Sequence, residues 1–359
     1  MDTLAVDAAV EAAASKMLLA RLLADLGADG PAQAALDRHC HPDCVWEVFH
    51  PFNRLEGNTA GARFFDRLRA AIPDCEYRTG FVIGGAYEGR AMVSSLSHAI
   101  GTFDHPWLGI PPTHGLVFLR MGVHATVREG RIAKAYVLFD VLDLMLQAGV
   151  YPFRRSPGSD AQWPFPPCDT GATAFAADPV RGAESLRIVY EMQIGLPGPK
   201  AETRAELTAR HSPHWHPNMN WFGPAGIGST RGLRGFRTYH GALFLQAFPD
   251  RHGFPRAAGC AEDTPGHYIQ LGDGNYAVTG GAPSLRGTHA GPEWLGLPPT
   301  GRVVDMRVAD WYRLDAGGRI VDNWVMIDVP HMLDQMGLDI FHDVVFAADR
   351  GRERWPIGV

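Results

Sequence analysis

The chain has 359 residues, of which 46% are hydrophobic and 20% charged, as in an ordinary soluble globular protein. A net charge of −6 without any Lys/Arg run argues against a nucleic-acid partner. No apolar run approaches the roughly 20 residues that span a membrane, and the first residues lack the basic segment of a signal peptide. The five cysteines are odd in number, so we expect free thiols and a cytoplasmic protein that does not contact a membrane.

Apolar residues at helical spacing predict a first helix over residues 4–27. Two shorter helices are expected at Ala32–Arg38 and Ala60–Ala71. Residues 77–139 are rich in strand formers and are broken by Gly and Pro turn signals. A closing helix is expected after Asp140. Helices, then strands joined by short turns, then a helix indicate an α+β fold in which an antiparallel sheet wraps over helices.

The same order of elements recurs in the second half, after a proline-rich segment that we interpret as a linker. The predicted elements are helices at 183–196, 200–210 and 232–247, strands between 254 and 327, and a helix from 329. We therefore predict a first domain over 1–153, a linker over 154–182, a second domain over 183–345 and a tail over 346–359.

An internal repeat supports this division. Trp107-Leu-Gly-Ile-Pro-Pro-Thr113 returns as Trp294-Leu-Gly-Leu-Pro-Pro-Thr300. Gly130-Arg-Ile132 returns as Gly318-Arg-Ile320, and Asp140 returns as Asp328, both at an offset of 188. Units of this length are duplicated domains, so any functional site is to be sought in both copies.

These motifs, with a His-Pro before the first strand of each half (His41, His216) and a glycine at the start of the third helix (Gly57, Gly232), resemble the SnoaL-like polyketide cyclases of the nuclear transport factor 2-like superfamily. The resemblance implies two cones of curved sheet, each closed by about three helices around a pocket. Cone domains of this superfamily often pair through their sheets, which implies an internal pseudo-dimer and leaves a homodimer open. The best-known members close rings by an aldol reaction on polycyclic aromatic polyketides, without a cofactor.

The resemblance also places the catalytic acid/base. In these cyclases it is an Asp five residues after the Ile of the Gly-Arg-Ile motif. Here Val137 and Val325 occupy that position, so both copies lack the carboxylate. This departure weakens the simplest assignment of cyclase activity.

The neighbouring strand offers replacements, because the family carries a His there. An alignment from the Pro-Pro-Thr turn, with a one-residue gap, pairs His124 with Asp310. An Asp inside an apolar strand is costly to bury unless it is paired or faces a pocket. We therefore predict Asp310 as a relocated acid/base and His124 as a second candidate; the alternative for His124 is an ordinary core or surface residue.

Asp140 and Asp328 are further catalytic candidates because they are duplicated. Each also stands where a strand ends and a helix begins, which favours the role of an N-cap. Candidate substrate contacts are mainly aromatic side chains and polar groups near the expected pocket, although aromatic residues are more often simply core. They are Trp46, Trp221, Tyr136, Trp311, Trp324, Asn323, His289 and His216.

Two histidine clusters carry metal-ligand residue types, His39-Cys-His41-x-x-Cys44 and His211-x-x-His214-x-His216. The cysteines have no counterpart in the second half, so we expect no metal site. No dinucleotide-binding, Walker or nucleophile-elbow motif occurs, which favours chemistry without a cofactor or plain binding.

The leading hypothesis is a cofactor-independent cyclase, isomerase or hydratase that acts on a hydrophobic, carbonyl-containing small molecule. The alternative is a non-catalytic binding or scaffold protein that kept the fold and lost the family's base. A third possibility divides the work, so that one half binds the ligand and the other only pairs with it.

Overall fold

The computed structural model describes residues 3–160, 163–165, 176–195, 213–253 and 264–342. The helix expected at 200–210, the tail expected at 346–359 and His211 lie outside the described residues. None of the helices in the described ranges is long and apolar enough to cross a membrane.

The first half contains a long helix, two shorter ones, a curved sheet and a closing helix. Its elements are α1 (Thr3–Gly27), α2 (Ala32–His39), β1 (Cys40–Val48), β2 (Arg54–Glu56), α3 (Gly57–Ala71), β3 (Glu76–Tyr87), β4 (Arg90–Thr102), β5 (Leu116–Arg128), β6 (Arg131–Phe139) and α4 (Val141–Gln147). Helix α1 buries leucines at positions 19, 22, 23 and 26, the spacing of one helical face.

The second half repeats this plan. Its elements are α5 (Pro179–Gly195), β7 (Trp215–Phe222), β8 (Thr230–Arg231), α7 (Gly232–Phe236), η1 (Arg237–Gly241), α8 (Ala242–Ala247), β9 (Ile269–Asp273), β10 (Tyr276–Thr288), β11 (Val303–Leu314), β12 (Ile320–Ile327) and α9 (Val329–Met336). The helix predicted at 232–247 is thus interrupted by one π-helical turn, η1. Such turns inside helices are often found at functional sites.

Each half forms one open sheet of six strands, in the orders β2-β1-β6-β5-β4-β3 and β8-β7-β12-β11-β10-β9. The two orders are identical once the repeat is taken into account, which confirms the duplication at the level of topology. Neighbouring strands are antiparallel except for one pair in each sheet, β1 with β6 and β7 with β12.

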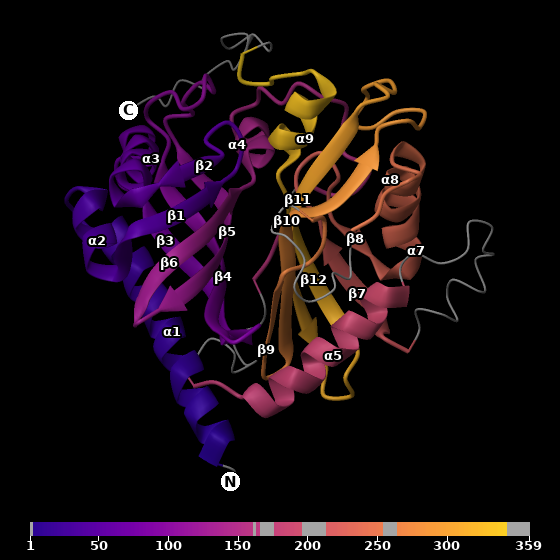
Figure 1. Ribbon diagram of the computed structural model, residues 1–359. Helices are drawn as coiled ribbons and strands as arrows, with labels where there is room; N and C mark the ends of the chain where they lie inside the picture. Colours follow the sequence, from indigo (N-terminus) through magenta and orange to yellow (C-terminus); the bar gives the residue numbers. More distant parts are fainter. Residues whose placement is uncertain (1–2, 161–162, 166–175, 196–212, 254–263, 343–359) are drawn as a thin grey trace, which may run out of the picture.

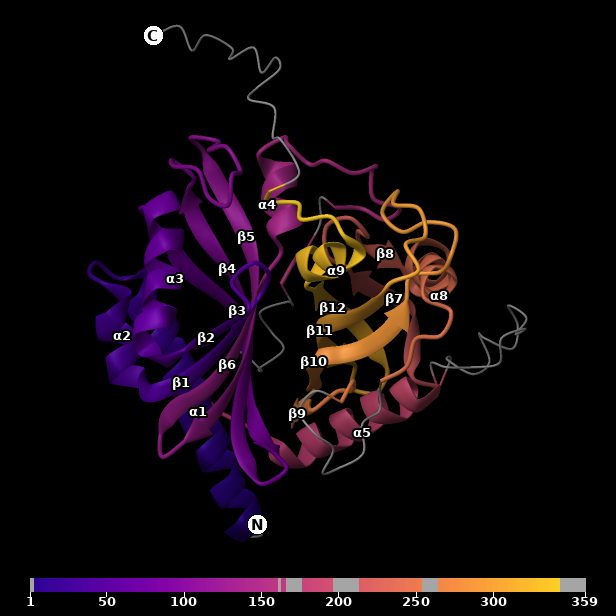
Figure 2. The same cartoon turned by 45° about the horizontal axis from the view of Figure 1, so that its top comes forward.

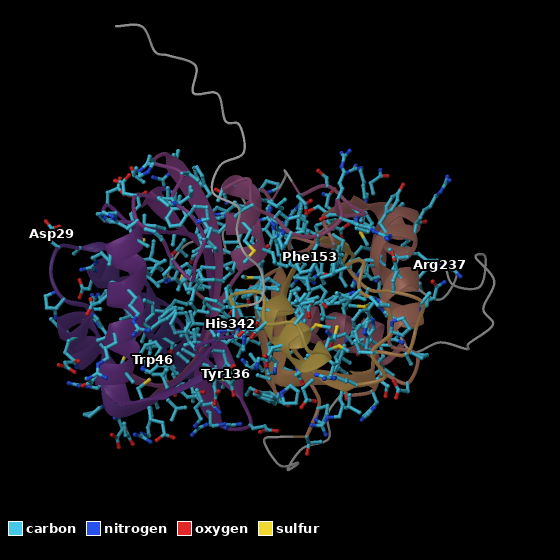
Figure 3. All side chains as sticks on the ribbon, turned by 90° about the horizontal axis from the view of Figure 1, so that it is seen from above. Asp29, Trp46, Tyr136, Phe153, Arg237 and His342 are labelled. Carbon is cyan, nitrogen blue, oxygen red and sulfur yellow. The ribbon has the colours of Figure 1, made fainter. Side chains whose placement is uncertain are left out.

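The two sheets face each other in the middle of the molecule and their helices lie outside, α1–α3 on one side and α5, α7 and α8 on the other (Figures 1 and 2). This is the arrangement predicted as an internal pseudo-dimer. The facing surfaces are tightly fitted: a Cβ on Gly122 would lie 2.3 Å from the indole of Trp311. At the same interface the Tyr268 hydroxyl donates to that of Tyr136 at 3.0 Å. Figure 3 shows Tyr136 where the two halves meet.

A buried ion pair also joins the halves. Lys16 of α1 is fully buried, and its Nζ lies 2.6 Å from Oδ2 of Asp273 at the end of β9. The same ammonium donates to the carbonyl of Ala176, just before α5. A buried ion pair is costly to break because the remaining charge is left without a partner.

Two aspartates connect the halves reciprocally. Asp140 accepts a hydrogen bond from the Asp143 amide at the start of α4, and its second oxygen accepts from the Ala225 amide of the other half at 2.9 Å. Asp328 does the same with the His331 amide of α9 and, at 3.0 Å, with the His50 amide of the first half.

An arginine completes each of these sites. Arg120 lies 3.0 Å from Asp140, and Arg307 lies 3.1 Å from Asp328. Both carboxylates are almost inaccessible to solvent. The N-cap role predicted for the duplicated aspartates is therefore confirmed, and the same side chains also hold the two domains together.

We expect Asp328→Ala to lower the free energy of unfolding by about 3 kcal/mol, because it leaves the His50 amide without its acceptor, removes the carboxylate partner of the half-buried Arg307 guanidinium and uncaps helix α9. Urea denaturation measures the loss. Asp43→Ala is the matched control, since its carboxylate is 73% exposed and pairs with Arg128 at the surface, an interaction worth at most about 1 kcal/mol. Equal losses in the two variants would contradict the bridging role of Asp328.

Candidate active site

A buried polar cluster lies on the face of the second sheet that is turned away from the first half. On β11, Asp310 and Tyr312 alternate onto the same face. Asp310 stands opposite Val325 of β12 and Thr279 of β10, and Tyr312 stands opposite Asn323. We refer to the buried side chains of Asp310, Tyr312, Asn323, Thr279 and, from helix α5, Gln193 as the second-cone cluster.

Gln193 shows that the cluster lies on the helix-covered face of the second sheet, because its side chain contacts the cluster from helix α5. Its amide nitrogen donates to the Thr279 hydroxyl at 2.8 Å and to the Tyr312 hydroxyl at 3.2 Å. Its amide oxygen lies 3.3 Å from Nδ1 of His267. Burial lowers the pKa of His267 to about 3, so this imidazole is neutral at physiological pH. The cluster therefore lies between the sheet and helix α5, inside the second cone.

Asp310 is the titratable group at the centre of the cluster. It is 7% exposed, and burial raises the pKa of its carboxyl group to about 7. Hydrogen bonds from Asn323 and Tyr312 oppose this rise without cancelling it. The Asn323 amide nitrogen lies 3.4 Å from Oδ1. A carboxyl group with a pKa near neutrality can both accept and return a proton, as general acid/base chemistry requires.

Aromatic side chains border the same cone. Trp221 of β7 stacks on His240 of η1, with ring centroids 4.2 Å apart, and meets Phe236 edge-on. Burial lowers the pKa of His240 to about 3. Trp215 lies between Phe236 and Tyr312. Trp221 is thus placed as predicted for a substrate contact, although its contact with a ligand stays a prediction.

The predicted pairing of His124 with Asp310 is wrong. His124 stands opposite Tyr136 in the first sheet, and Trp311 stands opposite Trp324 in the second. Because Tyr136 and Trp324 are repeat partners, the counterpart of His124 is Trp311. The counterpart of Asp310 is Val123, which stands opposite Val137. The one-residue gap in the sequence alignment was therefore an error. A shift of one residue moves a side chain to the opposite face of a strand.

His124 accordingly lies between the two sheets and not in a cone. Its ring stacks on Trp311 with centroids 5.0 Å apart. The Ser94 hydroxyl bridges them, 2.8 Å from Nδ1 of His124 and 2.8 Å from the Trp311 indole nitrogen. Burial lowers the pKa of His124 to about 3. This neutral imidazole is part of the contact between the halves.

The other candidate site residues lie at several separate places in the molecule. Tyr136, Trp311 and Trp324 lie on the faces that meet, where Trp324 stacks on Phe222 and donates to the Pro164 carbonyl. His289 is buried beside Phe248, with Nδ1 3.2 Å from the Thr300 hydroxyl. His216 accepts from the Asn218 amide at the start of β7. Asp140 and Asp328 lie at the junction of the halves. The structure thus brings Asp310, Asn323 and Trp221 into the second cone.

The first cone has a different interior. Val123 and Val137 occupy the positions of Asp310 and Val325, and both are buried. Trp46 packs edge-on against Phe65, and a Cβ on Gly61 would lie 2.6 Å from its indole nitrogen. Phe49, Phe64 and Phe139 continue this aromatic core. Trp46, predicted as a substrate contact, therefore lies in a densely packed core (Figure 3).

The histidine-cysteine motif of the first half does not converge on one point. His39 contacts Asp25, and His41 contacts the Arg128 carbonyl. Cys40 and Cys44 are buried among apolar residues.

Sequence reasoning missed Tyr312, Gln193, Thr279 and His267. Tyr312 had a signal, since it is two residues after Asp310 and must share its face. Gln193 is on a helix far from β11 in the sequence, so no local pattern connects it with Asp310.

One family model matches this chain. Residues 18–148 and 281–336, together more than half of the chain, match the family model of SnoaL-like polyketide cyclase. Among curated proteins, none matches the sequence.

Several solved structures are similar to this chain. A SnoaL-like protein of Jannaschia sp. CCS1 is 21% identical over 39% of this chain and 94% of its own, with a TM-score of 0.34. IdmH of Streptomyces antibioticus is 19% identical over 37% of this chain and 97% of its own, with a TM-score of 0.33. Bal32a, from a soil-derived mobile gene cassette, is 13% identical over 36% of this chain and 91% of its own, with a TM-score of 0.29.

The raised pKa of Asp310 makes a prediction about stability. The folded-state value of about 7 is above the unfolded value of about 3.9, so the folded chain holds the proton more tightly and loses stability as pH rises through that window. Asp310→Asn removes this loss. The variant should gain stability relative to the native protein between about pH 4 and about pH 8, by up to about 4 kcal/mol.

Urea denaturation at a series of pH values measures this difference. Asp43→Asn, at an exposed carboxylate, should show little pH-dependent gain. A stability difference between Asp310→Asn and the native protein that does not change with pH would show that the carboxyl group titrates as if exposed.

Proposed function

This chain belongs to the SnoaL-like polyketide cyclase family, and from that premise we propose that its second half is a cofactor-independent acid/base enzyme. The substrate is a hydrophobic small molecule that carries carbonyl groups, as a polyketide does. Asp310 transfers the proton. The reaction is a ring closure or isomerisation that begins with the removal of a proton from carbon.

One observation carries this proposal: the burial of Asp310 among Asn323, Tyr312 and Thr279 on the cone face of β11 and β12. The family's usual carboxylate position holds Val325, which stands directly opposite Asp310 on the adjacent strand. A carboxylate at position 310 thus projects from the neighbouring strand on the same face. The base is displaced by one strand and still serves the same cone.

The proposed first step forms an enolate. The Asp310 carboxylate removes a proton from a carbon next to a carbonyl group, and the electron pair of the C–H bond moves to the carbonyl oxygen. In a ring closure, the enolate carbon then attacks a second carbonyl of the same molecule. The protonated Asp310 returns its proton to the alkoxide that results, so no other co-reactant is required.

Neighbouring donors stabilise the charge that develops on oxygen. The Asn323 amide nitrogen lies 3.4 Å from Asp310, 3.2 Å from the Trp311 carbonyl and 3.4 Å from the Trp324 carbonyl, and can reorient toward an enolate. The Tyr312 hydroxyl accepts from Gln193 and donates to the Asp310 carboxyl group, so it lies beside the atom that removes the proton. Such donors are most effective in a buried site of low dielectric constant.

The proposal gives the two halves different roles. The first cone is filled by Trp46 and its aromatic neighbours, and Val123 stands where Asp310 stands in the second. The first half then acts as a scaffold. It covers the face of the second sheet that points away from the second cone. A non-catalytic binding protein remains the second candidate, favoured by the valines at positions 137 and 325.

Deuterium exchange at carbon separates the two candidates. With a hydrophobic β-diketone as probe in D2O, we expect the native protein to accelerate exchange at the carbon between the carbonyl groups, with a rate that falls as pH drops below about 7. Asp310→Asn should lower the enzymatic rate at least about 100-fold. Asp43→Asn, far from the cone, is the control and should exchange at the native rate.

Binding of the probe without exchange, with the same affinity in Asp310→Asn, would support the non-catalytic candidate. Proton NMR follows both exchange and binding in the same sample.

His124 provides a contrasting prediction. His124→Phe keeps a ring to stack on Trp311 but leaves the Ser94 hydroxyl without one partner, so we expect it to cost about 1–3 kcal/mol of stability. The exchange rate of the folded variant should stay within about threefold of native, because His124 lies outside the cone. A loss as large as that of Asp310→Asn, in a variant that remains folded, would make His124 part of the catalytic machinery.

A further inference from the structure

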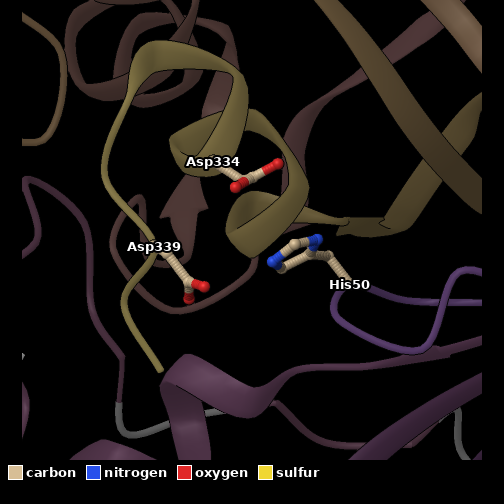
Figure 4. A group of neighbouring side chains, drawn as sticks. All are labelled: His50, Asp334 and Asp339. Carbon is tan, nitrogen blue, oxygen red and sulfur yellow. The ribbon is translucent and has the colours of Figure 1, made fainter. Parts of the chain in front are cut away.

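Three side chains that the sequence did not single out converge where the two halves meet. His50 lies in the loop after β1, Asp334 in α9 and Asp339 in the segment that follows α9. One ligand atom from each, an imidazole nitrogen or a carboxylate oxygen, lies within 4.8 Å of the others. Figure 4 shows the edge of the His50 ring turned toward both carboxylates.

His50 is held firmly in this position. Its amide donates to Asp328 at 3.0 Å, and its ring stacks on Phe341 with centroids 6.1 Å apart. The residue is 8% exposed, and its buried Nε2 has no hydrogen-bond partner among the described residues. A buried ring nitrogen without a partner destabilises the fold, so a ligand for this atom would be stabilising.

We propose that His50, Asp334 and Asp339 form a binding site for a divalent first-row transition metal such as Zn2+. One imidazole nitrogen and two carboxylate oxygens suit such an ion, whereas Mg2+ and Ca2+ prefer oxygen alone. Metal–ligand bonds of about 2.0–2.1 Å place tetrahedral ligand atoms about 3.3 Å apart. The exposed Asp334 side chain can rotate to close the remaining distance, and water completes the coordination.

The repeat shows that this site is specific to one side of the molecule. The positions that correspond to His50, Asp334 and Asp339 are Ala225, Leu146 and Tyr151. None of these can donate the same ligands, so the ion would bind once per chain. The site lies outside both cones, and its role is to tie the β1–β2 loop of the first half to the end of α9 in the second.

The proposal is tested with chelator-treated full-length protein. Calorimetric titration with Zn2+ should show one site per chain, and Zn2+ at a hundredfold excess over its Kd should raise Tm by about 4 °C. Co2+ should give visible absorption bands of a coordinated ion, and Mg2+ should produce neither effect.

Three variants locate the site. His50→Phe keeps the stack on Phe341 and the backbone bond to Asp328, and should abolish the Tm shift. Asp334→Asn and Asp339→Asn should each weaken Zn2+ binding at least about tenfold. His114→Phe is the matched control, because it also replaces a histidine that lies near an aspartate, Asp104 at 3.5 Å, but its imidazole is 54% exposed. This variant should bind Zn2+ as the native protein does.

Two results would overturn the proposal. One is native Zn2+ affinity in His50→Phe, which would place the ion at another histidine. The other is the absence of a saturable site in the native protein. Because Asp310 is not a ligand, the deuterium-exchange assay fails or succeeds independently of these outcomes.

Discussion

The reciprocal aspartate bridges are the interaction on which the rest of the molecule depends. Asp140 and Asp328 each accept from the first turn of a helix in their own half and from a backbone amide of the other half. One carboxylate thus fixes both a helix start and the position of the opposite domain. Since each is buried with an arginine, neither can be lost without leaving a charge unpaired. The sheets can therefore stay face to face without a second chain.

This internal pairing allows the halves to differ. A buried carboxylate such as Asp310 opposes folding, because burial disfavours its charged form. In the first cone the corresponding residue is Val123, which has no charged form to bury. This cone is filled by aromatic rings that pack around Trp46 and Phe64. In a homodimer both copies would have the same interior. In a tandem chain, one cone can be packed for stability while the other holds a polar cluster.

Most of the fold could be predicted, and less of the site. The helices of the first half, the capping aspartates and the repeat were visible because each depends on residues close together in the sequence. Asp310 was singled out by an alignment that wrongly paired it with His124, and the cost of burying a carboxylate in an apolar strand supported its choice. The assignment of His124 failed because one misplaced gap exchanges the two faces of a strand. Gln193 could not be found, since it reaches Asp310's neighbours from a helix that no local pattern links to β11.

The sequence by itself determined the duplication, the order of the elements and the valines at positions 137 and 325. These follow from periodicity, capping and spacing, which act over a few residues. Only the tertiary structure decided that Asp310 lies inside a cone while His124 lies between the sheets. It alone brought His50 beside Asp334 and Asp339. Such proximities depend on strand register and on the packing of one half against the other, which are properties of the whole folded chain.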